Sequence, residues 1–270
     1  MNRERNLADL VVPGRKILES PSLAAMIRED RPVPTFEETV GRTDISPAPV
    51  AEAVLDSGSL VSEEFRMLRA QVQDIAQQRP FRCFGLVSSA AGEGKTTVAL
   101  GLAAALAQMP DRRVLLVEAD LRKPAIETTL GLPPAPGLSE WLEGTNGSVV
   151  VRRLLSHRFF LLTAGQSDLK EPERLGSERM AGLLDAARAT FDSVVVDCPP
   201  LVPVADSVML QDLLDGFVYV VRARHSPREA VLKAMSRLRP DRIQGVVFNA
   251  RRDILPSYSD FGYRRYGKQR

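Results

Sequence analysis

The stretch SSAAGEGKTT, at residues 88–97, constrains this chain more than any other. It begins at the end of an apolar run, RCFGLVS, and leads into a long helical one, VALGLAAALAQ. A strand that turns through glycines into a helix points backbone N–H groups and the positive end of the helix dipole at one place. The stretch therefore predicts a strand–turn–helix unit with a phosphate site at its turn.

The turn fits the end of the P-loop pattern GxxxxGK(S/T), with Ser89 where the first glycine would stand. Lys95 is expected to reach the β and γ phosphates of ATP, and Thr96 to ligate Mg²⁺. The alternative is a flexible glycine turn before an ordinary helix. The predicted nucleotide-binding residues of this loop are Ala91, Gly92, Glu93, Gly94, Lys95, Thr96 and Thr97.

Short apolar runs alternate with helical runs through the rest of the chain. RRVLLVEA, SVVVD, GFVYVVRA and IQGVVFN are typical of strands, and helical segments such as MAGLLDAARA separate them. Nearly continuous apolar strands separated by helices indicate a parallel sheet covered on both faces. We therefore expect an α/β fold, a three-layer P-loop NTPase with a mostly parallel central sheet and helices on both faces.

Composition divides the chain into three parts. Residues 1–58 are rich in proline, threonine and charge, which predicts a largely disordered extension. Residues 59–250 form the expected P-loop domain, which begins with a helix with an N-cap serine at Ser62, and residues 251–270 form a flexible tail. No apolar run is long enough to span a bilayer, so the protein is expected to be cytoplasmic. Cys83 and Cys198 lack metal-ligand or CxxC spacing, which predicts buried, inert thiols.

Acidic residues end two of the predicted strands. Glu118 and Asp120 follow RRVLLV, and Asp197 ends SVVVD. In a parallel sheet these ends meet at the carboxyl edge beside the P-loop, where carboxylates hold the metal and orient the nucleophile. The alternative is helix capping or turn formation, as Asp120 could provide. The predicted catalytic residues are Lys95, Glu118, Asp120 and Asp197, and the predicted metal ligands are Thr96, Glu118 and Asp197.

With these motifs in place, the chain from about residue 60 to its end resembles the bacterial tyrosine kinases (BY-kinases) of capsule and exopolysaccharide synthesis, in the form without a fused membrane domain. SSAAGEGKTT resembles their Walker A motif, LLVEADLRKP their Walker A′, and VVVDCPPLVPVADSVML their Walker B with its downstream Asp206. GVVFN resembles the late strand whose asparagine, here Asn249, contacts adenine. The family usually has aspartate where Glu118 stands, and a shift of about 1 Å in a catalytic group is enough to weaken catalysis.

The resemblance extends to a helical motif and to the tail. EEFRMLR resembles the motif that the family uses for ring assembly, carried by Glu63, Arg66 and Arg69, although an exposed i,i+3 helix pair is the simpler alternative.

Three of the four tyrosines lie in PSYSDFGYRRYGKQR. The resemblance implies that they are phosphorylated in a neighbouring subunit, whereas the alternative is that they pack on their own domain. The implied phosphoacceptors are Tyr258, Tyr263 and Tyr266.

The resemblance also implies partners. It predicts a homo-oligomer, a ring by analogy, and a separate transmembrane activator that recruits the protein to the inner face of the plasma membrane and controls polysaccharide polymerisation and export. The formal net charge of +2 gives no large field, and no nucleic acid is expected.

Two other functions stay open at this point. A ParA/MinD-like positioning ATPase would share the fold, but its signature lysine would fall at Ala90. A nucleotide-binding scaffold made inactive by Glu118 would regulate export by assembly alone. A related iron–sulfur carrier would need a CxxC pair near the end of the chain, which the sequence lacks.

Overall fold

The structure is a computed structural model that describes residues 15–17, 32–39, 59–154, 158–166, 172–202 and 206–250. Its described strands form one nine-stranded sheet in the order β1-β2-β5-β6-β4-β7-β3-β8-β9. Their bounds are β1 Arg15–Ile17, β2 Thr35–Thr39, β3 Cys83–Ser88, β4 Val114–Glu118, β5 Ser148–Leu154, β6 Phe159–Leu162, β7 Ser193–Asp197, β8 Gly216–Arg222 and β9 Ile243–Asn249.

The six strands from β6 to β9 in this order are all parallel to one another. β5 runs antiparallel to β6, and β2 runs parallel to β5. β1 pairs antiparallel with β2 at the edge. Because the central strands are buried on both faces, they read as unbroken apolar runs, as in LLVE and VVVD. The expectation of a mostly parallel sheet is confirmed.

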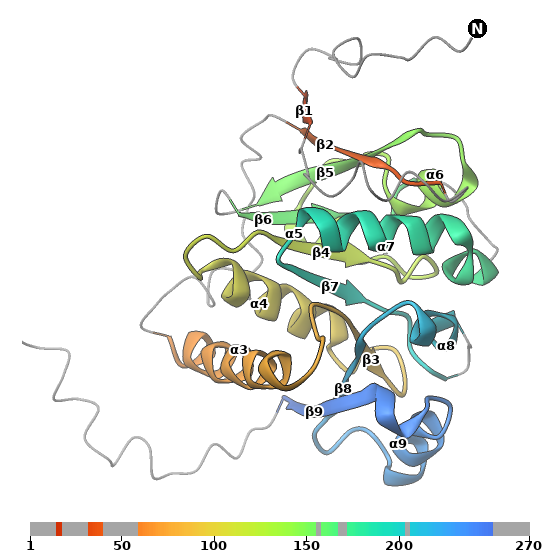
Figure 1. Cartoon of the computed structure of the whole chain (residues 1–270). Coiled ribbons are helices and arrows are strands. Elements are labelled where there is room, and N and C mark those ends of the chain that lie inside the picture. Colours follow the sequence, from red (N-terminus) through yellow and green to blue (C-terminus); the bar gives the residue numbers. More distant parts are fainter. Residues whose placement is uncertain are drawn as a thin grey trace, which may run out of the picture.

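Helices cover both faces of the sheet, which confirms the three layers (Figure 1). On one face lie α3, α4 and α5, and on the other lie α6, α7, α8 and α9. The helices are α3 Leu60–Gln78, α4 Lys95–Ala107, α5 Ile126–Leu130, α6 Leu138–Glu143, α7 Glu178–Thr190, α8 Asp206–Met209 and α9 Arg228–Met235, with 3₁₀ turns η2 Pro172–Gly176, η3 Leu210–Asp212 and η4 Pro240–Arg242.

Helix α3 packs on α4 at a glycine. A Cβ on Gly101 would lie 2.1 Å from the Phe65 ring, so only glycine lets the aromatic side chain approach this closely. The helix begins earlier than expected. Its N-cap is Ser59, whose hydroxyl accepts a hydrogen bond from the N–H of Ser62, and Ser62 itself is buried inside the helix. Both serines fit the local N-cap pattern, and the choice depends on packing.

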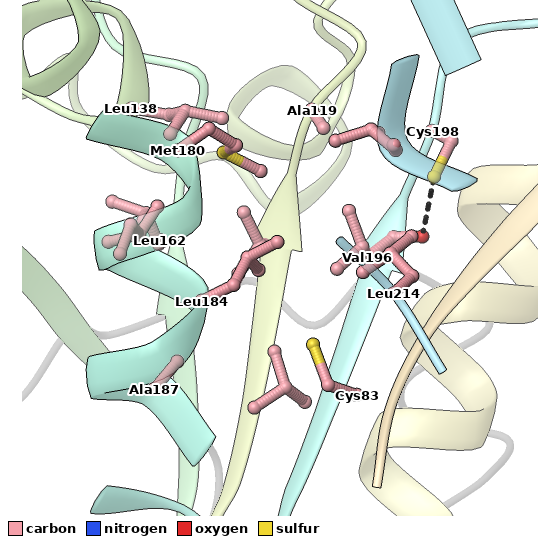
Figure 2. Packing of buried hydrophobic residues seen from close by; sticks show 14 of the residues in the cluster. Cys83, Ala119, Leu138, Leu162, Met180, Leu184, Ala187, Val196, Cys198 and Leu214 are labelled. Atoms are coloured by element: carbon pink, nitrogen blue, oxygen red, sulfur yellow. Dashed lines mark hydrogen bonds between the residues drawn. The ribbon is translucent and has the colours of Figure 1, made fainter. Parts of the chain in front are cut away.

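The two cysteines lie in the hydrophobic core, as predicted. Figure 2 shows Cys83 and Cys198 among aliphatic side chains such as Leu184 and Leu214, on the α7 side of the sheet. Burial raises the pKa of Cys83 to about 12 and also raises that of Cys198. The thiol of Cys198 donates to the Val196 carbonyl at 3.4 Å. The expectation that both cysteines are buried is confirmed, and their raised pKa favours the protonated thiol.

The N-terminal region differs from the expectation of a largely disordered extension at two segments, β1 and β2. Phe36 of β2 is 2% exposed and meets the Phe191 ring edge-on at 5.3 Å. Glu38 forms an ion pair with Arg153 of β5 at 2.9 Å. The sequence of β2 is charged and rich in threonine, with one aromatic residue, Phe36, so its local pattern for a strand is weak. Its tertiary contacts outweigh that weak local preference. The rest of residues 1–58 falls outside the described residues, apart from residues 32–34.

Among the described helices, none is both long enough and apolar enough to cross a membrane.

If β2 is a stable part of the sheet, Phe36→Ala should lower the free energy of unfolding by up to about 3–5 kcal/mol, the usual cost of removing a buried phenylalanine. Urea unfolding measures this, with Thr35→Ala, a partly exposed neighbour on the same strand, as control. Equal stability of the two variants would show that β2 does not contribute to the folded domain.

Candidate active site

The glycine turn connects β3 to α4 as predicted. Gly92 and Gly94 have φ values of 82° and 90°, in the left-handed region that glycine adopts without strain. Lys95 is the first residue of α4 and is only 6% exposed. The helix N-terminus therefore points its free N–H groups into the same place as the lysine ammonium, which is the electrostatics of a phosphate site.

Asp197 lies next to this turn. It ends β7, the strand between β3 and β4, and its Oδ2 accepts a hydrogen bond from the Thr96 hydroxyl at 2.6 Å. Its Oδ1 is buried and has no hydrogen-bond partner. Burial raises the pKa of Asp197 from 3.8 to about 7, although Thr96 and the Lys95 charge oppose the shift. The carboxylate thus has one oxygen free for a cation.

These two residues fit Mg²⁺. An unpartnered buried carboxylate oxygen beside a threonine hydroxyl is a hard-oxygen donor set. No cluster of three or more His, Cys, Asp or Glu side chains suited to a metal occurs in the described residues. Mg²⁺ commonly takes one or two protein ligands and completes its shell with phosphate and water, so the pair is sufficient.

Glu118, which the sequence predicts as a metal ligand, has both carboxylate oxygens engaged by backbone N–H groups. It is 1% exposed, and its Oε1 accepts from the backbone N–H groups of Ala125 and Ile126 at 2.6 and 2.7 Å. Its Oε2 accepts from the N–H of Ala164 at 3.1 Å. Both oxygens thus hold the end of β4 to the start of α5 and to the segment after β6. In this structure the carboxylate anchors two loops, and its assignment to metal and catalysis stays a prediction.

Asp120 makes the turn contact that was the alternative for it, and its catalytic role stays a prediction. Its Oδ1 accepts from the N–H of Lys123 at 3.2 Å, which is the turn-forming contact. Burial raises its pKa, while the charge of Lys95 lowers it, so the carboxyl lies within electrostatic reach of the P-loop lysine. The structure therefore brings Lys95, Asp120 and Asp197 together.

Arg122 and Asp206 form an ion pair that the sequence patterns did not predict. Arg122 Nε donates to Asp206 Oδ2 at 2.7 Å. Asp206 is 4% exposed, whereas the Arg122 side chain is 48% exposed. The pair joins the loop after β4 to the start of α8. Asp206 was part of the quoted Walker B resemblance, but no spacing links it to an arginine 84 residues earlier.

The other predicted site residues are only partly brought together. The Asn249 amide donates to the Glu93 carbonyl at 3.0 Å, so it faces the P-loop, and its adenine contact stays a prediction. Glu63 and Arg66 form the simple i,i+3 pair. Arg69 donates to the carbonyl of Ala105 at 2.9 Å, near the end of α4. The assembly role of these three residues is untested, and the tail tyrosines, Tyr258, Tyr263 and Tyr266, lie outside the described residues.

A cavity of about 660 Å³ lies away from this site, lined by residues of α7, by residues just before β3 and β8, and by residues of η4 and β9. Its central arginine, Arg188, pairs with Asp185 and Asp215 at 3.4 and 3.1 Å. The lining carries three arginines and four aspartates, so it has no excess of positive charge and does not offer the phosphate-binding chemistry of the P-loop.

Residues 84–238 match the sequence family described as the CobQ/CobB/MinD/ParA nucleotide binding domain (CbiA). The chain is also 32% identical over 214 residues to the tyrosine-protein kinase YwqD of Bacillus subtilis (strain 168), covering 78% of this chain and 89% of YwqD. The chain belongs to the bacterial tyrosine-kinase family. The family also includes the tyrosine-protein kinase wzc of Salmonella typhi, which is 30% identical over 221 residues. That match covers 80% of this chain but 30% of wzc.

Solved structures of the family share the fold. The kinase domain of the Escherichia coli tyrosine kinase ETK has a TM-score of 0.70 and 27% identity, covering 86% of this chain and 88% of that one. The VpsO kinase domain has a TM-score of 0.59 and 33% identity, covering 71% and 98%. MinD of Pyrococcus horikoshii, at a TM-score of 0.52 and 21% identity, has a similar fold. The P-loop NTPase fold class is therefore confirmed.

Replacing either of two carboxylates by its uncharged amide should change the free energy of unfolding, in opposite directions for the two residues. Urea unfolding at pH 8, without nucleotide or Mg²⁺, measures this change. Glu118→Gln should destabilise by about 1–3 kcal/mol, because one acceptor oxygen becomes an NH₂ group facing a backbone N–H. Asp197→Asn should stabilise, because it removes a buried charge with an unpartnered oxygen. Stabilisation by Glu118→Gln would contradict the anchoring role and favour a metal ligand.

Asp197 should also make stability depend on pH. Its pKa is higher in the folded protein, about 7, than the ordinary 3.8, so the folded state binds this proton more tightly than the unfolded chain. The stabilisation is fully present below about pH 4 and is lost as pH rises to 7, by up to about 4 kcal/mol. Unfolding curves from pH 4 to 8 should show this loss relative to Asp197→Asn; parallel curves would contradict it.

Proposed function

We propose that this protein is a Mg-ATP-dependent protein-tyrosine autokinase that phosphorylates its own C-terminal tyrosines in trans, within a homo-oligomer. The observation that carries the proposal is the Thr96–Asp197 pair at the P-loop, with one buried carboxylate oxygen left for a cation. Membership of a family whose relatives are named tyrosine-protein kinases supports the reaction.

Each residue of the site has a task in this reaction. The N–H groups at the start of α4 and the Lys95 ammonium bind the phosphates and stabilise the charge that develops on the transferred group. Thr96 and Asp197 would hold Mg²⁺, which when bound neutralises charge on the β and γ phosphates. Asp120, whose pKa is raised by burial, would accept the phenol proton as the tyrosine oxygen attacks the γ phosphorus and ADP leaves.

The tail supplies the substrate in this proposal. Tyr263 and Tyr266 are the favoured acceptors, with Tyr258 as a third. Each phosphate adds roughly 1.5 to 2 negative charges, which would repel the tail from an acidic site and loosen the oligomer. In this proposal a separate transmembrane protein of a polysaccharide export system activates the kinase. A relative named the succinoglycan biosynthesis transport protein ExoP, of Rhizobium meliloti, supports the link to polysaccharide export.

The engaged carboxylate of Glu118 favours one other function, a nucleotide-binding scaffold with little or no transfer activity. Glu118→Asp separates the two: a rise in phosphate transfer would show that the longer side chain is a handicap, and a fall would show that the site depends on it.

Lys95→Met should abolish phosphate transfer, because the ammonium that neutralises the phosphates is lost. Intact-mass spectrometry after phosphatase treatment and incubation with Mg-ATP measures transfer, and peptide mapping locates the phosphate. Lys233→Met, on the exposed surface of α9, is the matched control. Phosphate on Tyr263 or Tyr266 in the control but not in Lys95→Met is the expected result. Bound ATP without tail phosphate in the wild-type chain, even with an activator segment added, would favour the scaffold or a positioning ATPase.

A further inference from the structure

Glu93 is an unexpected residue for a phosphate loop. It lies between the two left-handed glycines, Gly92 and Gly94, yet it is only 2% exposed. A carboxylate in this loop repels nucleotide phosphates unless it is held away from them, because the interaction of like charges grows as the site becomes drier. Its side chain must therefore be fixed by contacts on the far side of the loop.

Those contacts come from the turn between β8 and α9. Glu93 Oε1 accepts a short hydrogen bond from the Ser226 hydroxyl, and Oε2 accepts from the N–H of Ala90 at 3.1 Å. The Ser226 hydroxyl also accepts from the N–H of Arg222 at 3.2 Å, so the serine is oriented by its own turn. One carboxylate thus joins the start of the P-loop, its middle and a turn more than 130 residues later.

Two more contacts hold the loop from the same side, and both use carbonyl oxygens. The Arg222 guanidinium donates to the Gly92 carbonyl at 3.0 Å, and the Asn249 amide donates to the Glu93 carbonyl at 3.0 Å. A Cβ on Gly94 would lie 1.9 Å from the Asn249 amide nitrogen, so the fit is close. Carbonyls that face these donors leave the following N–H groups free to face phosphate.

We propose that Ser226 and Arg222 are positioning residues for the nucleotide phosphates: they hold Glu93 and the Gly92 carbonyl on the far side of the P-loop and so set its shape before ATP binds. The inference rests on the proposed nucleotide site. Preorganised donors bind phosphate better than donors that must first be ordered. The turn after β8 therefore contributes to ATP affinity, although it contacts the P-loop on the side away from the phosphates.

The test is the affinity of the full chain for Mg-ATP by titration calorimetry. Ser226→Ala should weaken binding roughly tenfold, the usual effect of losing a hydrogen bond to a charged group. Ser226→Thr keeps the hydroxyl and should restore affinity. Ser226→Ala added to Glu93→Ala should cause little further loss, because Glu93→Ala already removes the oxygen that accepts from the Ser226 hydroxyl. Ser236→Ala is the matched control, since the hydroxyl of Ser236, just past α9, donates to the Lys233 carbonyl within that helix and lies on the exposed surface.

The outcomes separate this inference from the proposed function. If the wild-type chain does not bind Mg-ATP, the nucleotide site itself is wrong. If it binds and Ser226→Ala binds equally well, the site stands and the positioning role is wrong. A loss that Ser226→Thr does not restore, or that Ser236→Ala shows equally, would indicate general destabilisation and would also overturn the proposal. Restored affinity with Ser226→Thr and non-additivity with Glu93→Ala would support it.

Discussion

The hydrogen bond from Thr96 to Asp197 is the contact on which the site depends. It joins the first turn of α4 to the end of β7, a central strand, and so fixes the P-loop to the most buried part of the sheet. The carboxylate is almost completely buried, and burying it opposes ionisation. Thr96 and the nearby Lys95 charge offset part of that cost. A bound divalent cation would offset the remaining cost of burying the charged Asp197 carboxylate, so a carboxylate that is unfavourable alone would become a cation ligand.

Much of this arrangement follows from local sequence. The glycines, Lys95 and Thr96 act within one turn, so their spacing predicts their geometry. Asp197 could be placed because a strand end in a parallel sheet fixes where its side chain emerges. The sequence also indicated the central strands, since burial on both faces leaves unbroken apolar runs.

What the sequence did not predict depends on contacts between distant segments. The partners of Glu118 lie up to 46 residues away, and they are backbone N–H groups, which carry no residue signature. β2 joins the sheet through Phe36, in a segment whose composition favours disorder. The contact between Ser226 and Glu93 joins residues more than 130 positions apart. No local propensity or period reports such pairs, and they become visible only when the topology brings them together.

Strand order also separates the two ends of the described sheet. β1 and β9 are its opposite edges, with seven strands between them, as the red and blue arrows of Figure 1 show. β2 lies next to β1, and at about 4.8 Å per strand the seven spacings from β2 to β9 amount to roughly 34 Å before twist is considered. A fluorophore on β2 and another on β9 would therefore form a nearly fixed ruler within one molecule. Any closer approach between such labels would have to come from a different copy of the chain.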